Sequence, residues 1–194
     1  MSPRVGLNRA SVVEAAAVLA DEVGLEGVTL ARLSSGLGVR TPSLYNHIGG
    51  LDDLRRELAL IGTRELGERL GRAAVGKSGD EAVVMLAGAY RAYVAERPGL
   101  YAASVRSFRV SDPADEERRA AEGEVLGVVL DALSGYGLRG DDALHAVRGL
   151  RSVVHGFATL EGGGGFRMAL DPDESFRRLI AAFVEGLKKK LAKK

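Results

Sequence analysis

Side chains that can bind other molecules are concentrated in one short stretch of the chain, residues 40–47. They offer guanidinium, hydroxyl, phenol, amide and imidazole groups. Groups of these kinds bond to phosphate oxygens and to the edges of bases. Displayed on an exposed helix, they would therefore suit contact with nucleic acid. The members of the set are Arg40, Thr41, Ser43, Tyr45, Asn46 and His47.

The residues before this stretch predict a short helix that would support it. Thr29 can cap that helix, because its hydroxyl accepts a hydrogen bond from a free amide of the first turn. Leu30, Leu33 and Leu37 follow at helical spacing and give one apolar face. Gly38 comes next, and glycine best tolerates the left-handed conformation that ends a helix in a sharp turn. We therefore expect the chain to bend at Gly38.

A second short helix is predicted over residues 42–48. Thr41 is a possible cap, and Pro42 suits the first helical position, where its missing N–H costs nothing. Leu44 and Ile48 are four residues apart and would point back at the first helix. The other face of the second helix, which carries the polar set, has no apolar partner.

Two helices joined by a short turn with a glycine match the helix-turn-helix, whose second helix enters the DNA major groove. On spacing alone an alternative stays open, in which the stretch is a helical hairpin with Tyr45 and His47 as ordinary surface residues. The residues that we predict to contact DNA are Thr29, Arg40, Thr41, Pro42, Ser43, Tyr45, Asn46 and His47.

The run LGVRTPSLYNHI resembles the recognition region of the TetR family of bacterial transcriptional regulators. This sequence departs from the usual family pattern twice. Ile48 stands where a phenylalanine is usual, and Leu51 stands where a phosphate-contacting lysine is common. The resemblance implies a homodimeric regulator, expected to be a repressor, that binds a near-palindromic double-stranded DNA operator. It also implies release by an unknown small-molecule effector bound in the C-terminal domain.

Apolar spacing predicts helices throughout the rest of the chain, so the expected fold class is all-α. An N-terminal three-helix domain, residues 1–50, would precede a helical regulatory and dimerisation domain, residues 51–194. Gly135, Gly137 and Gly140 spell G-x-G-x-x-G, but a dinucleotide site would need a preceding strand, and none is predicted. The expected helices cover residues 8–24, 51–74, 78–96, 100–108, 113–136, 141–161 and 173–191.

The last two helices offer more apolar surface than one core requires, and such helices commonly pair across a two-fold axis. The segment from Arg151 to Phe166 resembles the regulatory domain of a TetR subgroup named for a Trp-His-Gly motif, with Val154 in place of the tryptophan. The alternative that both helices belong entirely to the core stays open. The predicted dimer residues are Val147, Val154, Phe176, Leu179, Phe183 and Leu187.

A possible effector pocket is suggested by aromatic residues and one histidine, because apolar sites with a few polar groups commonly bind small molecules. An equally weighted alternative makes His155 a core residue bonded to a backbone carbonyl. The histidines His47, His145 and His155 form no catalytic or metal-binding motif, so we expect no enzyme, metal or cofactor. The predicted effector-binding residues are Tyr90, Tyr93, Tyr101, Phe108 and His155.

Composition limits the possible classes without indicating nucleic acid. The net charge is only +1, and most of the lysines lie in the C-terminal KKKLAKK, so the charge pattern shows no basic domain. Positive charge at the DNA-binding surface must therefore come from the placement of Arg9, Arg32 and Arg40. The chain has no cysteine, no apolar run of membrane-spanning length and no signal-like N-terminus, so we expect a cytoplasmic protein without membrane contact. The alternative function is an all-helical small-molecule-binding protein or enzyme that does not bind DNA.

Overall fold

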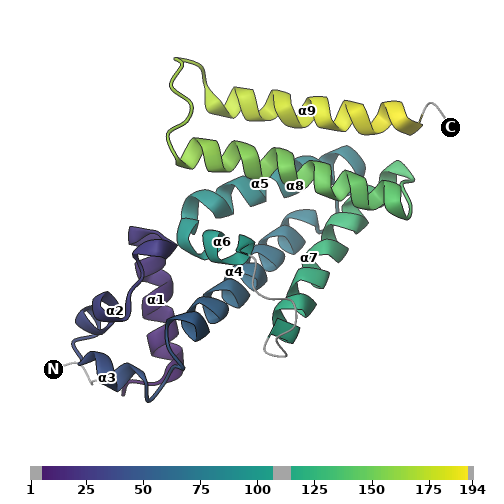
Figure 1. The fold of residues 1–194 in the computed structure, drawn as a ribbon. Coiled ribbons are helices and arrows are strands. Elements are labelled where there is room, and N and C mark those ends of the chain that lie inside the picture. The colour runs from purple at the N-terminus through teal and green to yellow at the C-terminus, as the bar shows by residue number, and fades with distance from the viewer. Residues whose placement is uncertain (1–5, 107–114, 192–194) are drawn as a thin grey trace. The chain divides into compact units, whose positions relative to one another are not determined.

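The computed structural model describes residues 6–106 and 115–191, and its regular elements there are all helices (Figure 1). The predicted all-α class is confirmed. The observed ends mostly lie within two or three residues of the predicted ones, apart from the second helix of the motif. The helices are α1 (Arg9–Val23), η1 (Leu25–Gly27), α2 (Leu30–Gly36), α3 (Thr41–Leu44), α4 (Leu51–Ala74), α5 (Gly79–Glu96), α6 (Pro98–Val105), α7 (Glu116–Leu133), η3 (Ser134–Tyr136), α8 (Asp141–Gly162) and α9 (Pro172–Leu191).

Contacts divide the chain into two compact units. The first holds residues 1–63 and 97–118, and the second holds residues 64–96 and 119–194. Helix α4 therefore contributes its beginning to one unit and its end to the other, and α6 belongs to the first unit although it follows α5 in the chain. The boundary predicted after residue 50 separates a DNA-binding domain from a regulatory domain by function, and it stays a prediction.

Capping side chains fix where the first helices begin. Asn8 accepts a hydrogen bond from the Ser11 amide (2.9 Å), and the Ser11 hydroxyl in turn accepts one from the Asn8 amide (3.1 Å). This capping box starts α1 at Arg9. Thr29 caps α2 as predicted, with its hydroxyl accepting from the Arg32 amide at 3.2 Å.

The core of the first unit is made mainly of aliphatic residues from α1, α2, α3, α6 and the beginning of α4. Valines and alanines form the buried face of α1, whereas Val23 is 43% exposed because the helix ends there. The fully or nearly fully buried residues of this core include Val12, Ala16, Ala20, Val28, Leu33, Leu44, Ile48, Leu54, Leu58 and Leu100.

Helix α6 is held tightly within the first unit. Asp21 of α1 accepts hydrogen bonds from the amides of Gly99 (2.9 Å) and Leu100 (3.2 Å), and it pairs with Arg97 at 2.7 Å. The two backbones approach so closely that a Cβ on Gly99 would lie 2.1 Å from the Ala20 carbonyl carbon. A side chain of α1 thus satisfies amides at the start of α6, which a helix cannot satisfy by itself.

In the second unit α5 packs on α8 and α9, and α8 and α9 lie side by side (Figure 1). Arg91 of α5 joins all three helices: its Nε donates to Glu161 at 2.7 Å, and its Nη1 pairs with Asp173 at 2.8 Å. The same guanidinium lies over the rings of Phe157 and Phe176. These contacts fix the two ends of the segment between α8 and α9.

A second polar cluster ties the other end of α9 to the same unit. Asp80 accepts a hydrogen bond from the Tyr136 hydroxyl (2.7 Å) and pairs with Lys188 (2.5 Å). The Lys188 ammonium and the Tyr136 hydroxyl hold the pKa of Asp80 below its ordinary value. The three glycines around residue 137 lie between α7 and α8, so they separate two helices as the sequence predicts.

Candidate functional site

Helices α2 and α3 form the predicted two-helix motif, but the second helix is shorter than expected. The turn between them passes through Gly38 at φ +66°, the left-handed conformation that was predicted there. Helix α3 covers only Thr41–Leu44, and a hydrogen-bonded turn follows, in which the amides of His47 and Ile48 both donate to the Leu44 carbonyl (2.9 and 3.0 Å). The helix predicted over residues 42–48 is therefore one helical turn followed by a tight turn.

Thr41 has a different role from the predicted cap. Arg40 is the residue before the helix, and the Thr41 hydroxyl instead bonds to the Ser34 hydroxyl of α2 at 2.9 Å. Ser34 is 4% exposed, so this bond lies where the two helices meet and satisfies a buried polar group. The threonine consequently joins α2 to α3, and its hydroxyl already has a partner.

The predicted contact residues lie mostly on the outside of the motif. Leu44 and Ile48 are buried as predicted, whereas Tyr45 is 59% exposed. Thr29, Arg40, Pro42 and Asn46 are also exposed, and Thr41, Ser43 and His47 are partly exposed. Within the described part of the chain, hydrogen bonds or ion pairs engage none of the side chains of Arg40, Ser43, Tyr45, Asn46 and His47. These polar groups are free to bind an external partner.

Two of the arginines expected to supply positive charge are already engaged. Arg32 donates to the Gly27 carbonyl at 3.0 Å, next to the start of α2. Arg9, the first residue of α1, bonds to Asp53 through both terminal nitrogens (2.9 and 3.0 Å) and to Glu57 at 2.5 Å. Among the described arginines of the first fifty residues, Arg40 alone keeps its guanidinium without a partner.

The pairing of Arg9 extends to the end of the motif. Its Nη1 also donates to the His47 carbonyl at 3.1 Å, and the Gly49 amide donates to Asp53 at 2.8 Å. The bond to Arg9 is the largest cause that lowers the pKa of Asp53, and the bonds to Asp53 and Glu57 raise the pKa of Arg9. No local pattern in the sequence indicates this cluster, since Arg9 is more than forty positions from Asp53 and Glu57.

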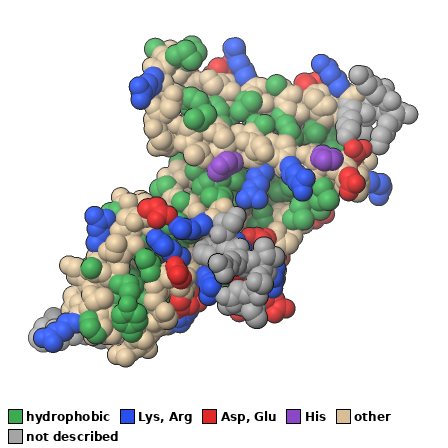
Figure 2. Space-filling view, in the orientation of Figure 1, with side chains coloured by type: hydrophobic (Ala, Val, Ile, Leu, Met, Phe, Trp, Pro, Cys, Tyr) green, Lys and Arg blue, Asp and Glu red, His purple; other side chains and the backbone are tan. Residues whose placement is uncertain are grey.

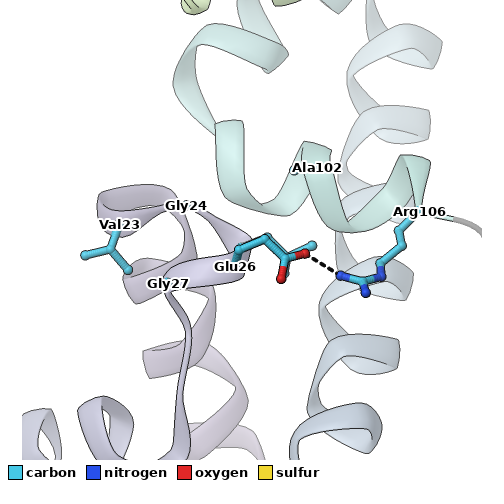
Figure 3. Close-up of a pocket in the computed structure, with 7 residues that line it drawn as sticks. Val23, Gly24, Glu26, Gly27, Ala102 and Arg106 are labelled. Atoms are coloured by element: carbon cyan, nitrogen blue, oxygen red, sulfur yellow. Dashed lines mark hydrogen bonds and ion pairs between the residues drawn. The ribbon is translucent and has the colours of Figure 1, made fainter.

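A shallow pocket of about 450 Å³ lies in the first unit, beside the turn that precedes α2 (Figure 3). Its walls are mainly apolar, with Val23, Leu25 and Ala102 among them. Glu26 lies at its edge and pairs with Arg106 of α6 at 2.6 Å and with Arg55 of α4 at 3.4 Å. The pocket contains none of the predicted effector-binding residues.

The predicted effector-binding residues do not form one group within a single unit. Tyr90 and Tyr93 are buried on α5, and His155 is partly exposed on α8, all in the second unit. Tyr101 is buried on α6 in the first unit, and Phe108 lies outside the described residues. Their assignment to an effector site stays a prediction.

The predicted dimer residues differ sharply in exposure. Val154, Phe176 and Leu187 are at most 8% exposed and belong to the core of the second unit. Leu179 is 36% exposed, and Val147 and Phe183 are partly exposed. Figure 2 shows hydrophobic side chains along this pair of helices. The exposed ones include Leu144 and Leu160 on α8, and Phe166, Met168 and Leu170 are exposed in the segment between α8 and α9.

Comparisons with known proteins agree over nearly the whole chain. Residues 83–183, just over half of the sequence, match the family model described as "Tetracyclin repressor-like, C-terminal domain". The HTH-type transcriptional regulator YobS of Bacillus subtilis is 38% identical over 188 residues, which cover 96% of each chain. No helix among the described residues is long and apolar enough to cross a membrane.

Two solved structures share the fold. A protein of unknown function from Rhodococcus sp. RHA1 has a TM-score of 0.77 at 20% identity, over 95% of this chain and 97% of that one. A TetR protein of Acinetobacter baumannii AYE, solved in complex with minocycline, has a TM-score of 0.62 at 21% identity, over 96% and 95%. The narrower assignment to the Trp-His-Gly subgroup stays a prediction. The chain belongs to the TetR family and is a ligand-responsive, DNA-binding transcriptional regulator.

Proposed function

We propose that the protein is a homodimeric repressor that binds a near-palindromic operator through residues 40–47 of each protomer. The observation that carries the proposal is the set of exposed polar side chains without partners on α3 and the turn after it, held in place by buried Leu44 and Ile48. Arg40 and Tyr45 would contact phosphates, and Asn46 and His47 would face base edges. The two segments would lie about 35 Å apart, one turn of DNA.

Two other predicted contacts have supporting roles in this proposal. Thr29 lies at the exposed start of α2, and its hydroxyl already caps that helix. Thr41 bonds to Ser34, so it orients α3 and its hydroxyl is not a free donor. Pro42 and Ser43, at the start of α3, complete the proposed surface.

The DNA contact is tested with Tyr45→Ala. The side chain is 59% exposed, so its truncation should leave the melting temperature nearly unchanged. A hydrogen bond to a charged group contributes about 1.5–3 kcal/mol, which corresponds to a loss of operator affinity of about tenfold or more. The operator is obtained by selection from random duplex DNA, and Val18→Ala on the exposed face of α1 is the control. Equal affinity of Tyr45→Ala and the parent protein, or selection of no palindrome, would contradict the proposal.

The dimer would form through the outward side of α8 and α9. The apolar residues still exposed there support this choice, with Leu179 on α9 and Leu144 and Leu160 on α8. Sedimentation at micromolar concentration should give a species of about 41 kDa, twice the chain mass of 20.5 kDa. Leu179→Glu should shift it toward the monomer, whereas Val84→Glu, on an exposed position of α5, should not. A parent protein that sediments only as a monomer would refute the dimer.

The effector would be a small molecule bound in the second unit near Tyr90, Tyr93 and His155. Support comes from the aromatic residues of α5 and from the family, one of whose solved members holds minocycline. The ligand can release DNA only if it binds the two conformations with different affinities. A thermal-shift screen tests this: an effector should raise the melting temperature and lower operator affinity together. We also propose that the protein acts by binding and not by catalysis, since its relatives are named as regulators.

A further inference from the structure

The cluster around Arg9 holds the end of the segment that contacts DNA. We propose that Arg9 and Asp53 are positioning residues for operator recognition: they fix the backbone of residues 47–49 and do not themselves bind DNA. This inference rests on the proposed function, in which residues 40–47 meet the operator. It assigns a role in recognition to two charged residues that lie outside the DNA-contacting segment.

Buried Leu44 and Ile48 anchor the segment, but they do not fix the course of the chain after Ile48. Helix α3 has only four residues, and a helix this short is not stable by itself. After Ile48 the chain continues through Gly49 and Gly50, with Gly50 at φ +116°. Glycine has more conformational freedom than any other residue. Two consecutive glycines therefore do not by themselves fix the orientation of α4 relative to the motif. Contacts of side chains must supply it.

Arg9 and Asp53 bond to the backbone just before the two glycines and at the first of them. The Arg9 guanidinium donates to the His47 carbonyl (3.1 Å), before the glycines, and the Asp53 carboxylate accepts from the Gly49 amide (2.8 Å). The two side chains are joined by paired hydrogen bonds of 2.9 and 3.0 Å. Bidentate pairs of this kind have defined geometry as well as strength. The start of α1, the turn after α3 and the first turn of α4 are therefore held by one network.

The same contacts make Arg9 a poor ligand for phosphate. Both terminal nitrogens already bond to the Asp53 carboxylate, and Nη2 also bonds to the Glu57 carboxylate at 2.5 Å. One guanidinium between two carboxylates leaves the cluster with a net negative charge. Because Arg9 and Asp53 carry opposite charges, simple attraction to DNA and the positioning role predict opposite outcomes when the Asp53 charge is removed.

The experiment compares Arg9→Gln and Asp53→Asn in the full-length protein, with the operator selected above. Attraction to phosphate predicts that loss of the positive charge weakens binding and that loss of the negative charge strengthens it. The positioning role predicts that both substitutions weaken binding, by about tenfold or more. Affinity is measured by fluorescence anisotropy over a series of salt concentrations, well below the melting temperature of each variant.

The dependence of affinity on salt provides the second readout. The slope of log K against log salt falls by about 0.9 for each phosphate contact that is lost. We expect an unchanged slope for Arg9→Gln and Asp53→Asn, and a smaller slope for Arg40→Gln, the proposed phosphate contact. Arg72→Gln is the matched surface control: Arg72 forms an exposed pair with Glu68 at 3.6 Å, near the other end of α4, and its loss should change neither quantity.

Arg9→Lys separates geometry from charge. Lysine keeps the positive charge but cannot form the paired bonds of a guanidinium, so we expect a loss of affinity in this variant as well. If Arg9→Gln does not fold, Arg9→Lys and Asp53→Asn carry the test. A merely structural role would lower the melting temperature of the variants and leave the affinity of the folded molecules unchanged, and that result would overturn the proposal.

Two further results would also overturn the positioning role: tighter binding by Asp53→Asn, or a smaller salt slope for Arg9→Gln. Failure of the proposed function gives a different pattern, because Tyr45→Ala and Arg40→Gln would then bind the operator like the parent protein. If those two variants lose affinity while Arg9→Gln and Asp53→Asn do not, the DNA-contacting segment is correctly assigned and the positioning role is wrong.

Discussion

The close approach of α1 and α6 gives a sharp prediction for Gly99→Ala. A new Cβ would lie 2.1 Å from both the carbonyl carbon and the oxygen of Ala20, and 2.6 Å from the amide nitrogen of Asp21. Carbon atoms in favourable contact are about 3.5–4.0 Å apart, so the two backbones would have to separate by more than about 1 Å. The obstructing atoms are all backbone, so no side chain can rotate away to make room.

The magnitude follows from the contacts that such a shift would break. Overpacking in a well-packed interior costs about 1–3 kcal/mol. A shift of this size would also weaken the hydrogen bonds from the Gly99 and Leu100 amides to Asp21, now 2.9 and 3.2 Å. Loss of a helix cap costs about 0.5–2 kcal/mol. We therefore expect Gly99→Ala to lower the free energy of unfolding by about 2–4 kcal/mol.

The assay is urea unfolding at a fixed protein concentration, followed by far-ultraviolet circular dichroism. Gly88→Ala is the matched control, because Gly88 lies inside α5, is exposed and has open space where the Cβ would be placed. Replacing an exposed glycine inside a helix by alanine stabilises by about 1 kcal/mol. The same chemical change should thus move the two midpoints in opposite directions. A Gly99→Ala protein as stable as the parent would refute the close approach of α6 to α1.

Two other substitutions test the polar clusters. Arg91→Met should lower the free energy of unfolding by about 1–3 kcal/mol, because it leaves the Glu161 carboxylate without its cation. The control Arg72→Met, at an exposed ion pair, should change the free energy of unfolding by less than about 0.5 kcal/mol. Equal effects of the two substitutions in urea unfolding would contradict the role of Arg91. Arg9 holds the pKa of Asp53 below its ordinary value of 3.8, so the stabilisation by Asp53 should be complete above that pH and decline as pH falls below it. The difference in the free energy of unfolding between the parent and Asp53→Asn should therefore stay constant near neutral pH and become smaller below about pH 4. A difference that persists unchanged in acid would show that the contact between Arg9 and Asp53 does not depend on the ionised carboxylate.

Features encoded by neighbouring residues were predictable from the sequence. The caps at Asn8 and Thr29, the turn at Gly38 and the burial of Leu44 and Ile48 all follow from spacing within a few positions. Burial on the later helices was less predictable. The apolar stripe of α9 contains both Phe176 and Leu179, yet α5 and α8 cover the first and leave the second 36% exposed. A helical pattern shows that a face is apolar, but it does not show which neighbour covers each part of that face.

Polar contacts between distant segments were beyond the reach of such patterns, and α1 shows the reason most clearly. Arg9 at its beginning pairs with Asp53, and Asp21 near its end pairs with Arg97, so the partners lie 44 and 76 positions away in the chain. Nothing in the spacing of these residues distinguishes them from charges that face solvent, and an arginine near the motif suggests a phosphate contact. Only after hydrophobic packing has placed α1 between the motif and α6 do the charges meet. The apolar periodicity of α1 therefore encodes its position, and that position determines which role each of its charged residues can have.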